Sequence, residues 1–170
     1  QNMYCPLEVA GVFEVKDAKD TNPQYTDLVC LPEDHIMIID VSNNRCCLLD
    51  SLFRNISSYR FPYRPWSVRM FEGQEVAVSL TDQNQIQFLA VKCNNIRSTR
   101  MIKTRLPFWG IANAGNGSIV LSGPVFNRNK CYWSVINDRG EETSYHEYWE
   151  KKCNNSFLAL NASKTRVYIS

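Results

Sequence analysis

A motif that recurs along the chain limits the folds open to it more than any other feature. The stretches "PWSVRMFEGQEVAVSL" and "FWGIANAGNGSIVLSG" share one order: a Trp, an apolar residue two positions later, a polar turn containing Gly, and a short apolar segment. Aligning Trp66 with Trp109 also places residues 76–78 on residues 119–121. The two stretches are therefore copies of one structural unit.

Two further copies flank this pair. On the N-terminal side Leu28 aligns with Val68, and on the C-terminal side Phe157 aligns with Trp109. Four copies in register indicate a repeat architecture in which each unit buries its apolar surface against its neighbours.

Each unit reads as four short strands. In the first unit the runs "YTDLVC", "HIMIIDVS", "CCLLDS" and "SSYRFP" are rich in β-branched and aromatic residues and are separated by turn-forming residues. Four antiparallel strands in a unit of roughly 40–45 residues are typical of β-propeller blades. The sequence predicts an all-β propeller of four-stranded antiparallel blades, with three full blades and parts of a fourth.

The repeat also predicts the organisation of the chain, as one propeller domain over residues 1–170. The expected blades cover approximately residues 25–62, 66–107 and 109–148, with residues 157–170 and 1–16 contributing further strands. Three and a half blades leave a sheet edge open. The chain is thus expected to be a fragment of a longer propeller, a ring completed by a partner or a second copy, or a small closed ring.

Large aromatic residues occupy the same place in successive units. Trp66, Trp109 and Phe157 are in register, and flat rings fill the space between two twisted sheets well. We expect these three side chains to wedge between adjacent blades rather than to stack on a ligand.

The seven cysteines show no metal-binding spacing. Buried free thiols are the first interpretation and suit Cys30, Cys46 or Cys47, and Cys131. The alternative is a secreted, disulfide-bonded glycoprotein, which four N-x-S sequons favour. The sequons begin at Asn55, Asn116, Asn154 and Asn161.

The sequence offers little for catalysis. His35 and His146 are the only histidines, and no nucleophile or phosphate-binding signature accompanies them. We expect no enzyme activity, no metal and no cofactor. No apolar run is long enough for a membrane helix, so no membrane partner is expected, and the net charge of +2 does not by itself indicate nucleic acid.

The order of strands in a blade sorts the turns onto two faces. Turns between the second and third strands share a face with the connections between blades. The remaining turns lie on the opposite face, which is expected to be acidic and carries Glu33, Asp34, Glu72, Glu141 and Glu142. The first face is expected to be basic and to bind a partner, because rigid scaffolds present their binding residues on loops. The candidate residues are Asn43, Asn44, Arg45, Tyr63, Arg64, Asn84, Arg105, Arg128 and Lys130.

The stretches "IMIIDVSNNRCCLLD", "PWSVRMFEGQEVAVSLTDQNQIQFLAV" and "LNASKTRVYIS", with the second motif above, resemble the NHL-type propeller region of the tripartite-motif-like proteins of bivalve molluscs. The resemblance covers residues from about 12 to 170. It implies a cytoplasmic, non-enzymatic module that recruits a protein partner, and nothing in the chain resembles a RING finger or B-box. Single-stranded RNA, which some NHL propellers bind through basic loops, is the alternative partner.

Overall fold

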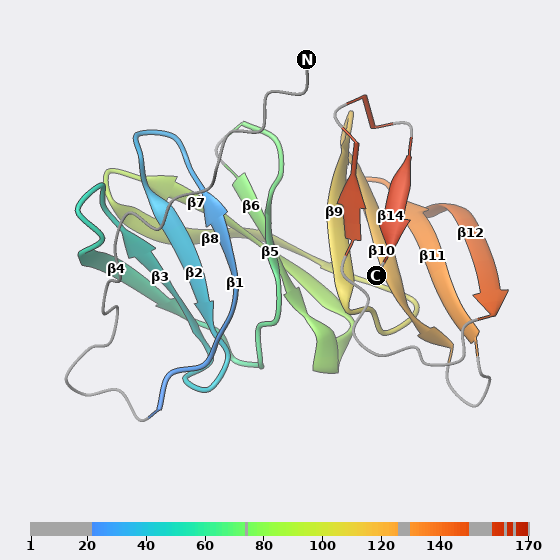
Figure 1. Cartoon of the computed structure of the whole chain (residues 1–170), viewed down its shortest axis with the longest axis horizontal. Coiled ribbons are helices and arrows are strands. Elements are labelled where there is room, and N and C mark those ends of the chain that lie inside the picture. Colours follow the sequence, from blue (N-terminus) through green and yellow to red (C-terminus); the bar gives the residue numbers. More distant parts are fainter. Residues whose placement is uncertain are drawn as a thin grey trace, which may run out of the picture.

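A computed structural model describes residues 22–73, 75–125, 130–149, 158–161, 163–164 and 166–169. It is a β-propeller with three four-stranded antiparallel sheets followed by a two-stranded one, and the sheets stand side by side as blades (Figure 1). In the four-stranded sheets, consecutive strands are hydrogen-bonded neighbours. The all-β propeller predicted from the repeat is confirmed.

The first blade contains β1 (Tyr25–Cys30), β2 (Ile36–Asp40), β3 (Arg45–Leu49) and β4 (Asn55–Arg60). The second contains β5 (Val68–Met70), β6 (Glu75–Leu80), β7 (Gln85–Lys92) and β8 (Asn95–Lys103), with a 3-10 turn η1 (Thr81–Gln83). The third contains β9 (Gly110–Gly115), β10 (Ser118–Val125), β11 (Lys130–Ile136) and β12 (Glu142–Trp149). The fourth, partial blade contains β13 (Leu158–Leu160) and β14 (Val167–Ile169). Residues 1–16, which were expected to add strands, lie outside the described residues.

The strand registers confirm the alignment of the first three units. Residues at equivalent positions of the alignment form equivalent pairs between the first two strands of each blade. These pairs are Leu28 with Ile38, Val68 with Val78, and Ile111 with Leu121. The fourth unit is displaced by one residue, because Leu158 and not Ala159 pairs with Ile169. The predicted alignment of this last unit is therefore wrong by one position.

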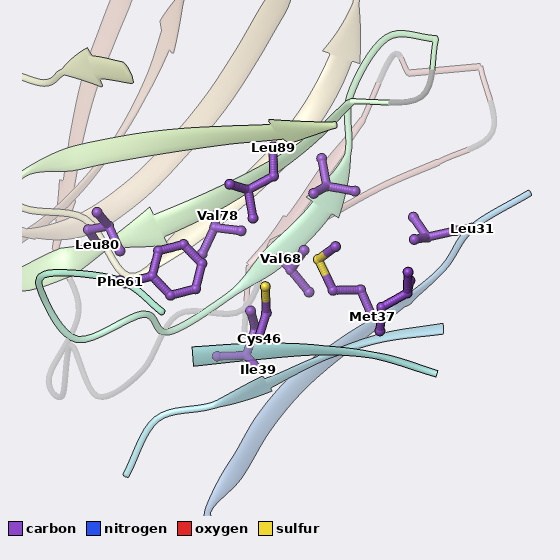
Figure 2. Packing of buried hydrophobic residues seen from close by; sticks show 11 residues of the cluster. Leu31, Met37, Ile39, Cys46, Phe61, Val68, Val78, Leu80 and Leu89 are labelled. Atoms are coloured by element: carbon purple, nitrogen blue, oxygen red, sulfur yellow. The ribbon is translucent and has the colours of Figure 1, made fainter. Parts of the chain in front are cut away.

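Two large apolar clusters lie between successive blades. Figure 2 shows the one between the first and second blades, where Met37, Ile39 and Cys46 face Val78 and Leu89. Alternate residues of each strand supply these contacts, as the two-residue period of a strand requires. A second cluster, centred on Phe88 and Phe108, joins the second and third blades.

Polar side chains also connect the innermost strands. The Asp27 carboxylate on β1 accepts hydrogen bonds from the Ser67 hydroxyl (2.6 Å), the Val68 amide (3.0 Å) and the Arg69 guanidinium of the second blade. At the next joint the later blade is again the donor, because the Asn113 side-chain amide of the third blade donates to the carbonyl oxygens of Met70 (3.2 Å) and Phe71 (2.9 Å), but here the acceptors are backbone groups.

The aromatic wedges are not the residues that were predicted. Trp66 and Trp109 are half-buried and belong to neither large cluster, whereas Phe108 is completely buried. The Trp66 and Trp109 amides instead donate to the carbonyl oxygens of Ser79 and Ser122, one strand away. The buried position of the repeat is thus the residue before each tryptophan, Pro65 and Phe108. Phe157, the third predicted wedge, lies outside the described residues.

The five cysteines that the structure describes are of three kinds. Cys46 and Cys47 are buried thiols, as predicted, but Cys30 is an exposed thiol, as is Cys93. Cys131 is disulfide-bonded, so its prediction as a free thiol is wrong. Burial, followed by the neighbouring Cys47, raises the pKa of the Cys46 thiol to about 12.

This division predicts selective alkylation of the native protein. Because the thiolate is the reactive form and must also be reached, iodoacetamide at pH 8 should label Cys30 and Cys93 and leave Cys46 and Cys47 unlabelled. Peptide mass mapping after brief labelling measures this. Labelling of Cys46 as fast as Cys93 in the folded protein would contradict the burial described here.

Candidate functional site

The antiparallel order of the strands places the connections on two faces of the molecule. The β2–β3 turn and the β4–β5 connection (residues 61–67) lie on the first face. The β1–β2 and β3–β4 turns lie on the second. On the first face the Phe61 amide donates to the Asn44 carbonyl and the Thr104 amide to that of Asn84, each at 2.7 Å. Asn44 and Asn84 both have left-handed backbones, with φ of 49° and 53°, so equivalent turns are tied to the next connection in the same way.

Arg45 does not reach the surface of this face. It is the first residue of β3 and is 5% exposed, and its Nε lies 3.1 Å from Oδ2 of Asp40, which is 0% exposed. The Asn43 side-chain amide donates to the same oxygen at 2.7 Å. The expectation that Arg45 is a solvent-exposed turn residue is wrong, because an acidic residue across the hairpin allows its charge to be buried.

Tyr63 and Arg64 lie in the β4–β5 connection and are exposed, Tyr63 by 42%. The Arg64 guanidinium lies over the ring of Trp66, 5.8 Å from its centroid. Arg60, at the end of β4, is also exposed and donates to the Asn43 carbonyl at 3.4 Å. We refer to Arg60, Tyr63, Arg64 and Trp66 as the arginine–aromatic group.

The sequence predictions do not include two members of this group. They place Trp66 in the packing between blades and Arg60 in a strand. The repeat contained a signal for Arg60, because in the next unit Lys103 occupies the corresponding end of β8 and is likewise exposed.

Two other predicted site residues are engaged by acidic partners. Arg105 lies 3.0 Å from Glu142 and over the ring of Tyr145, at 4.8 Å. Lys130 lies 2.9 Å from Glu147. These pairs lie among the outer strands rather than with the arginine–aromatic group, and Arg128 lies outside the described residues.

The contact between Arg105 and Glu142 corrects the expected charge separation. Arg105 follows β8 and was placed on the basic face, whereas Glu142 begins β12 and was placed on the acidic face. Twist rotates the outer strands of a blade away from the inner ones, so their ends meet on the flank of the molecule. The β6–β7 turn of the first face also carries the exposed Asp82, so the predicted separation of charge between the faces is incomplete.

Among the described residues, His35 Nδ1 lies 3.3 Å from the Pro32 carbonyl oxygen, and His146 contacts Trp133 and Ser144. The ring of His146 stacks on Trp133 with centroids 4.2 Å apart, and its Nε2 lies 3.1 Å from the Ser144 hydroxyl. Among the described residues there is no group of three His, Cys, Asp or Glu side chains that could hold a metal ion. The described residues also form no helix of the length and hydropathy that crossing a membrane requires.

Comparison with solved structures defines the class of this protein as a β-propeller. Hydrazine synthase of Kuenenia stuttgartiensis superposes with a TM-score of 0.68 and 12% identity, over 86% of this chain and 43% of that one. Virginiamycin B lyase of Staphylococcus aureus gives 0.61 and 17%, over 86% and 48%. The WD40 domain of Toxoplasma gondii coronin gives 0.62 and 9%, over 87% and 38%.

At these identities the comparisons establish the fold alone. The chain spans about half or less of the length of these proteins. No protein-family model and no curated protein sequence matches it.

Proposed function

We propose that this chain is a non-enzymatic interaction module that binds an acidic segment of a partner protein through the arginine–aromatic group. The observation that carries this proposal is the grouping of two exposed arginines with an exposed tyrosine and a half-buried tryptophan at one inter-blade connection. Arginine and aromatic residues are enriched where protein interfaces gain most of their binding energy. Asn43 and Asn44 border the group and belong to the proposed site.

This role is based on the resemblance to the propellers of tripartite-motif-like proteins, in which the propeller recruits the substrate. Membership of this chain in that family is part of the proposal. A lyase stands among the similar folds, and its activity is a property of that protein.

Charge reversal tests the site. The double variant Arg60→Glu and Arg64→Glu should lose partner capture by at least tenfold, because two cationic contacts become repulsive. The fold should persist, because both side chains are exposed. Arg97→Glu with Arg139→Glu is the matched control, since it changes the same charge at exposed positions on β8 and in the β11–β12 turn.

The readout is quantitative mass spectrometry of proteins captured from lysate, with urea midpoints recorded for both variants. Equal loss of capture in the control variant would show that net charge and not this group governs binding. Unchanged capture in the double variant would reject the site.

Single-stranded RNA is the second candidate. It is favoured by the exposed ring of Tyr63 beside Arg64, because aromatic rings stack bases and arginines contact phosphates. RNA-dependent capture should vanish after nuclease treatment and fall steeply with salt, whereas capture of a protein should resist nuclease.

For the compartment, we propose the cytoplasm. Of the cysteines that the structure describes, all but Cys131 are thiols, and Cys30 and Cys93 among them are exposed. The disulfide of Cys131 favours the alternative of a secreted glycoprotein. Intact mass under non-reducing conditions, with and without glycosidase, separates the two.

We also propose that a second copy of the chain, or further blades, completes the ring. In the second blade, Val68 and Val78 lie on the side of the sheet that packs against the preceding blade. Leu28 and Ile38 occupy the equivalent positions in the first blade, so they lie on the side where a preceding blade would pack. Leu28 is 55% exposed. Solution mass by light scattering measures self-association directly, and a monomer at all concentrations would reject the second copy.

A further inference from the structure

The second face carries a cleft at the junction of the first two blades. Two adjoining cavities of about 240 and 260 Å³ share Leu31 and His35 in their walls. The first lies between the β1–β2 turn and the β7–β8 turn, and the second extends towards the β3–β4 turn. We call the two together the inter-blade cleft.

The floor of the first cavity is apolar and is built on the joint between the blades. Leu31 belongs to the buried cluster between them, and Val91 packs against that cluster. The second cavity is lined by the first blade alone, with Ile36 on the side of the sheet away from the joint. An apolar side chain entering the first cavity would therefore contact a surface supported from both blades.

The rim is acidic. Glu33 and Asp34 are adjacent, exposed and in the left-handed conformation, with φ of 60° and 56°, and each lines one of the two cavities. Within the part of the chain that the structure describes, neither carboxylate is in an ion pair. Lys92 on the opposite wall is the cationic residue of the rim, and Asp50 in the second cavity is paired with Arg54.

We propose that the inter-blade cleft binds a basic amphipathic peptide segment. An apolar side chain of the segment packs on Leu31 and Val91, and a neighbouring lysine or arginine reaches Glu33 and Asp34. Two cavities with a common wall suit two neighbouring anchors of one segment. The cleft selects the charge opposite to that selected by the arginine–aromatic group, so the two faces accept different partners.

Cys93 provides a reporter, because this exposed thiol lines the first cavity. The probes are n-butylguanidinium, which combines an alkyl chain with a cation, pentanoate, which carries an anion, and methylguanidinium, which lacks the chain. Saturating n-butylguanidinium should slow iodoacetamide labelling of Cys93 at least threefold. It should also shift the backbone amide resonances of Leu31, Glu33 and Val91, whereas the other two probes should do neither.

Glu33→Gln with Asp34→Asn should weaken the protection by n-butylguanidinium at least fivefold. Glu141→Gln, on another turn of the same face, should leave it unchanged. Equal effects of pentanoate, persistence of protection in the double variant, or amide shifts remote from the cleft would each overturn the proposal. None of these readouts involves the first face, so the result is independent of the proposed function.

Discussion

Replacing Asp40 by leucine should lower the free energy of unfolding by about 3–5 kcal/mol. The change removes the Asp40 carboxylate that pairs with the buried Arg45 guanidinium, and deleting one member of a buried ion pair is among the most costly single changes in a protein. It also removes acceptors of the Gln24 amide and the Asn43 side chain. Urea unfolding followed by tryptophan fluorescence measures the loss.

The repeat supplies a compensating variant. Asp40 and Arg45 are paired across β2 and β3, and the equivalent pair in the second blade is Leu80 with Gln85. The double variant Asp40→Leu with Arg45→Gln copies that solution and should recover at least half of the loss. Glu142→Gln, which weakens the exposed pair with Arg105, should cost less than about 1 kcal/mol. A single variant with a loss below about 1 kcal/mol, or a double variant worse than the single one, would contradict this account.

Replacing Phe108 by alanine should cost about 3–5 kcal/mol, because the ring is completely buried between the second and third blades and its removal leaves a cavity. The surroundings have little freedom to close that cavity. A Cβ atom at Gly123 would lie 2.9 Å from Cα of Phe108 and 2.5 Å from the Pro107 carbonyl oxygen. The Tyr132 hydroxyl donates to that same carbonyl at 2.9 Å, which fixes the connection further.

Trp109→Ala is the matched control, since it removes a larger ring one residue away. Because Trp109 is only half-buried, its loss should cost about 1–2 kcal/mol. Equilibrium urea unfolding of both variants decides the matter. A larger loss for Trp109 than for Phe108 would restore the tryptophans as the wedges between blades.

The sequence predicted the fold well because repetition adds information that a single unit lacks. Alternating apolar residues in one strand leave its partner undetermined, but three copies aligned on Leu28, Val68 and Ile111 specified strand pairs that the structure confirms. The alignment failed by one residue in the fourth copy, which places Phe157 on Trp109, Lys164 on Asn116 and Val167 on Ile119. A one-residue error matters in a strand, because it exchanges the two faces.

The candidate site was predicted less well. Whether a charged residue is exposed depends on which oppositely charged side chains lie near it in the fold, and the sequence alone does not show this. Arg45 follows two asparagines and resembles a turn residue in the sequence, yet it is buried in an ion pair with Asp40. Arg105 and Lys130 find carboxylates on a neighbouring strand or blade. Tyr63 and Arg64 are exposed, as predicted. The Trp66 ring lies under the Arg64 guanidinium and is not part of the buried cluster between the blades.

The two polar joints between innermost strands use different acceptors, a carboxylate at the first and backbone carbonyls at the second, and this makes the first joint specific for the blade that follows it. Asp27 needs donors from the blade that follows it, and the second blade supplies them through Ser67 and Arg69. At the aligned positions the third blade has Gly110 and Ala112, which carry no donor side chain. A rearranged chain in which the third blade followed the first would leave the Asp27 carboxylate without its two side-chain donors. The blades share one architecture, but the first blade is matched to the second and not to the third.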